Sequence, residues 1–202
     1  HDLLDVYETL RAEESAPTLP YSHTRPLRHR AEHLQIVHPQ DAHRFAALNI
    51  IASMQPIHAT SDMLMSDKYW GQRSSGAYAW RTQLKHGAVL AFGSDTPVEP
   101  INPLWGIHAA VTRRRADGSP GASGWYPEQR LTVSEAIDGF TKGPAFAARM
   151  ENELGSLEPG KLADLTLVDC DLLHCDPMAI REAEVLGTIV GGEFRFRSNG
   201  LS

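Results

Sequence analysis

Short apolar runs alternate with longer segments of helical periodicity along most of the chain. The apolar runs predict buried strands at 29–37, 50–54 and 88–92, because strands inside a parallel sheet read as nearly continuous apolar stretches. The periodic segments predict helices at 2–14, 39–48, 77–86, 104–114, 132–140 and 144–149. Strands that alternate with helices favour a parallel sheet and a fold of the α/β class.

Two long connections interrupt this alternation, and the last quarter of the chain follows a different pattern. Residues 59–76 and 116–127 are predicted loops, and loops of that length are usually functional or disordered. From residue 154 onward a turn leads into an alternating strand that ends near 169, and 188–196 reads as a hairpin around Gly191-Gly192. These features predict a small β unit after the α/β part.

Composition narrows the class of protein. Apolar residues make up 42% of the 202 positions, enough for a core, and the formal net charge of −6 argues against a nucleic-acid partner. No apolar stretch is long enough to span a membrane. The basic run 113–115 is interpreted as a solvated helix end. Two cysteines give no disulfide framework, which favours a cytoplasmic location. A targeting signal cannot be read from this sequence, because the chain enters a helical pattern at His1 without a preceding Met.

Polar side chains follow each predicted strand. The carboxyl ends of parallel strands are where ligands and catalytic groups gather in α/β folds. Asp95 stands after the third strand, between Gly93-Ser94 and Pro97, and its carboxylate suits a metal ion or a proton as well as the cap of the next helix. The polar residues after the first two strands are Glu32, His33 and Gln35, and Gln55 and His58.

Four short motifs occur along the chain. They are Arg30-x-Glu32-His33-x-Gln35, then Gln55-Pro-x-His58, then Gly93-Ser-Asp95-x-Pro97, and finally Gly155-Ser-Leu-Glu-Pro-Gly-Lys-Leu-Ala-Asp-Leu165. Their identity and order resemble the YtcJ-like branch of amidohydrolase family 3, within the metal-dependent amidohydrolase superfamily. The resemblance covers nearly the whole chain. It implies a distorted TIM (β/α)8 barrel, with 1–150 as its C-terminal half and 151–202 as the C-terminal strands of a small β-sandwich domain.

The resemblance also shows what is missing. The family carries a His-x-His metal pair on an early strand, a bridging lysine or acid on a middle strand, and a further histidine in a His-Ala-Ile-Gly-Asp-like motif. His1 is followed by Asp2-Leu3, so it is not equated with that histidine, and Lys161 belongs to the tail motif. The chain is therefore expected to be a fragment of an amidohydrolase.

By the same resemblance, the surviving site residues receive roles. Asp95 matches the catalytic base and metal ligand, and His33 a metal-ligating imidazole, with zinc the expected ion. His58, Gln35 and Gln55 match substrate-binding positions. Simpler interpretations remain beside these: a helix cap for Asp95, a structural hydrogen bond for His33, and a loop residue without a functional role for His58.

Two further groups of residues receive simpler interpretations. We expect Glu32 to form a buried salt bridge with an arginine such as Arg28 or Arg30. The segment from Cys170 to Cys175 is interpreted as a loop after a strand, because its spacing matches no paired-ligand zinc pattern well.

The implied function is cleavage of C–N bonds of a small-molecule amide by metal-activated water, in an intact enzyme that includes the missing N-terminal half or another chain. The alternative is a catalytically inert half-barrel that associates through open sheet edges, for example as a homo-oligomer. A deacetylase or a cyclic-amide hydrolase branch is a third interpretation.

Overall fold

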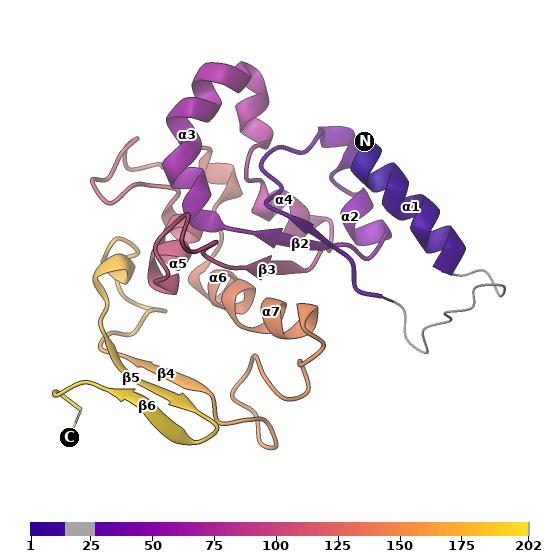
Figure 1. The fold of residues 1–202 in the computed structure, drawn as a ribbon. Coiled ribbons are helices and arrows are strands. Elements are labelled where there is room, and N and C mark those ends of the chain that lie inside the picture. The colour runs from indigo at the N-terminus through magenta and orange to yellow at the C-terminus, as the bar shows by residue number, and fades with distance from the viewer. Residues whose placement is uncertain (15–26, 202) are drawn as a thin grey trace.

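The computed structural model describes residues 1–14 and 27–201, which fold around a central parallel sheet with a small antiparallel sheet at one end (Figure 1). The central sheet has the strand order β1-β2-β3. Its strands are β1 (Arg30–Glu32), β2 (Ile51–Met54) and β3 (Leu90–Phe92), and neighbouring strands are parallel. The predicted α/β class and the three parallel strands are confirmed.

Helices connect the strands and cover the sheet. α2 and α4 pack against β2, whereas α6 and α7 pack against β3, and α5 lies against α3 and α6. Figure 1 shows α1 alongside α2, away from the small sheet. The helices are α1 (Asp2–Glu14), α2 (Arg44–Ala47), α3 (Pro56–Trp70), α4 (Trp80–Lys85), α5 (Pro103–Thr112), α6 (Val133–Phe140) and α7 (Lys142–Ala147), with short 3-10 helices η1 (Pro39–Asp41), η2 (Gly71–Gly76), η3 (Pro127–Gln129) and η4 (Ala179–Glu182).

Local sequence signals explain where several helices begin. Thr132 and Glu135 form the predicted capping box at the start of α6, with each side chain bonded to the other's backbone N–H. Asn102 caps α5 by accepting a hydrogen bond from the Leu104 N–H at 3.0 Å, and Pro103 occupies the first turn. No helix in residues 1–14 or 27–201 is long and apolar enough to cross a membrane.

The core is formed by the central sheet and the helices around it, α1 to α3 included. Trp80 is fully buried and its ring meets Phe92 at 6.3 Å, and Phe92 in turn meets Phe140 edge-on at 5.5 Å. Gly143 of α7 lies so close to the sheet that an added Cβ would stand 1.9 Å from the Leu90 carbonyl oxygen. This approach fixes α7 directly against β3.

The prediction of a loop at 59–76 was wrong, because most of that segment is α3 and η2. Pro56 sits in the first turn of α3 directly after β2. The helix exposes Leu64 and Tyr69 while it buries the polar side chains of Thr60 and Ser66, so its apolar pattern does not follow its buried face. Tertiary packing therefore outweighed the periodicity signal.

The first strand and the arginine run also differ from their predictions. β1 spans 30–32 instead of 29–37, since His33 and Leu34 both have positive φ and turn the chain away. Arg113 is buried, and the predicted solvated helix end is wrong for it. Its guanidinium lies over the rings of Trp80 and Trp125, at 4.6 and 4.8 Å from their centroids.

The C-terminal part is the predicted β unit. β4 (Leu165–Val168), β5 (Val185–Val190) and β6 (Glu193–Arg197) form an antiparallel sheet in which β5 is central. Gly191 and Gly192 have positive φ in the predicted β5–β6 turn. The expected division of the chain at residue 150 stays a prediction.

Candidate metal centre

Three side chains from the carboxyl ends of the three parallel strands meet at one edge of the sheet. His33 follows β1, His58 lies in the first turn of α3 after β2, and Asp95 follows β3 by three residues. One ligand atom from each of the three lies within 4.8 Å of the others. The expected convergence of His33 and Asp95 is therefore present, and His58 joins them.

The geometry of this group, here called the strand-end triad, is compact. The Asp95 Oδ2 atom is 4.0 Å from His33 Nδ1 and 3.8 Å from His58 Nε2. The two imidazole rings stack with their centroids 5.9 Å apart and an interplanar angle of 17°. The two histidines thus flank a single carboxylate oxygen across a gap that is too wide for direct hydrogen bonds.

The backbone holds two members of the triad in an unusual conformation. His33 has φ 70° and Asp95 has φ 59°, both in the left-handed region, which is sparsely populated by residues other than glycine. Asp95 does not cap a helix, because the next helix, α5, begins at Pro103 and its N-cap is Asn102. The structure therefore excludes the helix-cap interpretation of Asp95.

Gln55 orients one of the imidazoles. The Gln55 side chain is buried, and its Oε1 atom is 2.9 Å from His33 Nδ1. An amide oxygen only accepts, so His33 Nδ1 donates in this contact, and the same nitrogen lies 4.0 Å from Asp95 Oδ2. A carbonyl group that fixes a histidine in this way is typical of metal sites, where such contacts set the ring orientation.

Gln35 contacts Tyr78 through both its backbone and its side chain. Its backbone carbonyl accepts the Tyr78 N–H at 3.0 Å, and its side chain also bonds to the Tyr78 side chain. The Tyr78 hydroxyl donates a hydrogen bond to the Asp62 carboxylate. Burial, together with this carboxylate, raises the pKa of Tyr78 well above its usual range. The sequence analysis did not single out Tyr78 or Asp62, since neither belongs to a motif.

Glu32 pairs with an arginine as expected, but at the surface. Its carboxylate is 3.3 Å from Arg30 Nε, and both side chains are about half exposed. The expectation of a buried salt bridge was therefore wrong. Arg28 pairs with Glu151 instead, with an N–O distance of 2.6 Å.

The segment from 170 to 175 behaves as a loop. Cys170 and Cys175 are both free thiols, and neither belongs to a group of potential metal ligands in the part of the chain that the structure describes. His174 pairs with Asp171 at 2.7 Å on the surface. Residues 169–178 form turns after β4, so the predicted loop is confirmed.

Two features of the strand-end triad suit a metal ion: the types of its side chains, and a buried polar atom without a hydrogen-bond partner among the described residues. An imidazole and a carboxylate, such as those of His33 and Asp95, are ligands that zinc and related divalent ions prefer. His58 Nε2 is buried and has no hydrogen-bond partner among the described residues, although it faces Asp95. The side chains of His33 and Asp95 are 46% and 37% exposed, so the described residues leave this site open to solvent on one side.

Residues 2–196 match the model of the amidohydrolase family, and the chain belongs to that family. The YtcJ-like family expected from the motifs is confirmed, and metal-dependent hydrolases are among the structures that the chain resembles.

Three curated relatives are similar along most of the chain. The protein LONG AFTER FAR-RED 3 of Arabidopsis thaliana is 35% identical over 95% of the chain, and the putative amidohydrolase YtcJ of Bacillus subtilis is 31% identical over 83%. The N-substituted formamide deformylase of Arthrobacter pascens is 29% identical over 98%. The chain covers 31%, 32% and 34% of these relatives, so it spans about a third of their length.

Solved structures place the chain in the same group. A metal-dependent hydrolase from Pyrococcus horikoshii matches 87% of the chain and 32% of its own length, with a TM-score of 0.70 and 27% identity. A mutant of the atrazine chlorohydrolase TrzN from Arthrobacter aurescens, solved with zinc and atraton, matches 83% of the chain and 36% of its own length, with a TM-score of 0.58; at 22% identity it shows the fold alone.

Proposed function

We propose that the chain is the C-terminal part of a zinc-dependent hydrolase that cleaves C–N bonds in small amides, formamides among them. The observation that supports it most is the strand-end triad, because donors from three strand ends face one another in a chain that belongs to the amidohydrolase family. The formamide substrate class is suggested by the deformylase, which is similar over 98% of the chain.

In this proposal His33 and Asp95 hold the metal ion. When bound, the ion lowers the pKa of water and polarises the amide carbonyl group. Asp95 takes the proton from the attacking water and returns it to the departing nitrogen, because its carboxylate stands at the strand end where that water and the substrate meet. Gln55 holds the His33 ring in place through the 2.9 Å contact.

His58 is assigned to the substrate side of the same space. Its Nε2 atom is 3.8 Å from Asp95 Oδ2 and lacks a hydrogen-bond partner among the described residues. An imidazole N–H in that position donates to the carbonyl oxygen as negative charge develops on it. Gln35 remains a substrate-binding candidate at the rim, beside Tyr78.

The alternative, that this chain alone is catalytically inert, has its own support. The site is open on one side, and the central sheet has just three strands among the described residues, whereas a closed barrel of this type needs eight. β1 and β3 are both edge strands of that sheet, and an exposed edge pairs readily with further strands. We therefore assign turnover to the intact protein.

The test uses the intact protein, loaded with zinc, and a panel of N-substituted formamides and N-acyl amines. Formate or carboxylate release is expected, and Asp95→Asn is expected to lower kcat by about 10²–10⁴. Asp117→Asn, which changes an exposed loop carboxylate bonded to Ser119, serves as the matched control with unchanged kcat. Absence of hydrolysis across the panel, or full activity of Asp95→Asn, contradicts the proposal; the 202-residue chain is expected to be inactive.

A further inference from the structure

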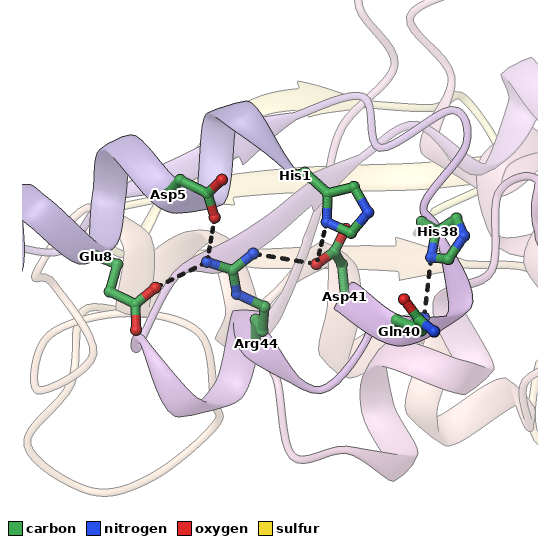
Figure 2. Close-up of polar contacts among 7 residues, drawn as sticks. All are labelled: His1, Asp5, Glu8, His38, Gln40, Asp41 and Arg44. Carbon is green, nitrogen blue, oxygen red and sulfur yellow. Dashed lines mark hydrogen bonds and ion pairs between the residues drawn. The ribbon is translucent and has the colours of Figure 1, made fainter.

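A second group of metal-type ligands lies away from the strand-end triad. His1 precedes α1, His38 lies between β1 and η1, and Asp41 ends η1. One ligand atom from each lies within 4.8 Å of the others, and the two imidazole centroids are 5.2 Å apart. Figure 2 shows the His1 ring above the Asp41 carboxylate, with His38 beside it.

The Asp41 carboxylate is the unusual member of this group. Its side chain is 4% exposed, and its Oδ1 atom accepts a hydrogen bond from Arg44 at 3.1 Å. His1 Nδ1 lies 3.1 Å from the Oδ1 atom and 3.0 Å from the buried Oδ2 atom, and the amino group of His1 also bonds to this carboxylate. The carboxylate oxygens and the imidazole nitrogen therefore lie close enough to bind one cation.

The charges around Asp41 also favour a cation. Arg44 contacts Asp5 at 2.6 Å and Glu8 at 2.9 Å in addition to Asp41, as the dashed lines in Figure 2 show. Three carboxylates, one guanidinium and the amino group of His1 give this group a formal charge of −1 with neutral histidines. The arginine therefore positions Asp41 without making the surroundings positive, and a divalent cation is attracted.

We propose that His1, His38 and Asp41 form a second binding site for a divalent transition-metal ion of the zinc class. Two imidazoles and a carboxylate suit zinc, whereas calcium and magnesium prefer oxygen ligands alone. His1 and His38 are exposed, so solvent can fill the remaining coordination positions. The ion links the start of α1 to η1, two segments that are 40 positions apart in the sequence.

The experiment measures zinc binding to the 202-residue chain by calorimetry in a variant that lacks the strand-end ligands, His33→Ala with Asp95→Asn. We expect one zinc ion per chain. The informative further change is His38→Asn: His38 Nδ1 accepts the Gln40 N–H at 3.3 Å, and asparagine keeps such an acceptor while it removes the imidazole. His38→Asn is expected to weaken zinc binding at least tenfold.

A matched control and a second readout separate ligation from folding. His43→Asn changes an exposed imidazole five positions further along, which belongs to neither ligand group, and is expected to leave the affinity unchanged. Zinc is expected to raise the melting temperature of the His33→Ala, Asp95→Asn variant, but much less after His38→Asn. No zinc binding by the former variant, or equal affinity with and without the His38 imidazole, overturns the proposal. Because the strand-end ligands are absent throughout, failure here leaves the proposed hydrolase site standing.

Discussion

His108 makes the stability of this chain depend on pH in a way that can be worked out from the structure. The side chain lies in α5 and is 1% exposed, and its Nε2 atom has the Thr112 hydroxyl at 3.4 Å. Burial lowers the pKa of His108 from its ordinary value of 6.5 to about 4, and the positive charges of Arg181 and Arg114 act in the same direction. The folded chain therefore keeps this imidazole neutral in mildly acidic solution.

The sign and size of the effect follow from the two protonation states. Between pH 6.5 and about 4 the unfolded chain binds a proton at this histidine and the folded chain does not, so stability falls as the pH is lowered through that window. At about pH 5 the expected loss is about 2 kcal/mol relative to pH 7, from the difference between the two pKa values. Below the folded pKa the loss levels off.

The assay is urea unfolding, followed by circular dichroism, of the 202-residue chain and of His108→Gln at pH 7 and about pH 5. Glutamine cannot titrate. Between the two pH values the His108→Gln variant is therefore expected to lose about 2 kcal/mol less stability than the unchanged chain, whatever the substitution costs at pH 7. His43→Gln, at an exposed position, controls for general histidine effects. Equal pH dependence in all three chains, or an NMR titration of His108 near 6.5, refutes the reasoning.

Three further predictions concern packing, an ion pair and the strand-end triad. Gly143→Ala is expected to lower the free energy of unfolding by about 3 kcal/mol, measured with urea, because its Cβ would stand 1.9 Å from the Leu90 carbonyl oxygen. The hydrogen bonds from Arg81 lower the pKa of Glu135 to about 2. The stability that this pair contributes is therefore expected to be lost as the pH falls from 4.5 toward 2, and Glu135→Gln should abolish that part of acid unfolding. Gln55→Ala is expected to weaken zinc binding at the strand-end triad by about 10–100-fold in calorimetry, because the His33 ring loses the hydrogen bond that orients it. An unchanged zinc affinity would contradict this orienting role of Gln55.

The regular part of the fold was readable from the sequence. The apolar runs that contain Ile51 and Leu90 predicted buried parallel strands, and Thr132 with Glu135 predicted the start of α6, because both signals are local and strong. The polar residues at strand ends then predicted one shared edge, where His33 and Asp95 do converge. That prediction followed from the parallel arrangement alone, because the carboxyl ends of parallel strands lie at the same edge of a sheet.

The features that escaped prediction depend on contacts between distant residues. α3 exposes apolar side chains such as Leu64, so its sequence did not show helical periodicity. The burial of Arg113 depends on Trp80 and Trp125, which a local pattern does not reveal. The left-handed backbone conformation at His33 ends β1 early. The sequence does not predict it, because histidine tolerates this conformation but does not require it.

The account rests on one ion shared by His33 and Asp95, and anomalous diffraction at the zinc edge from crystals of the zinc-loaded chain tests it most directly. The predicted result is a peak at the strand-end triad within about 2.0–2.2 Å of an imidazole nitrogen of His33 and a carboxylate oxygen of Asp95. Zinc that binds elsewhere and leaves this position without a peak, or a crystal structure in which these two side chains point away from each other, would contradict the account.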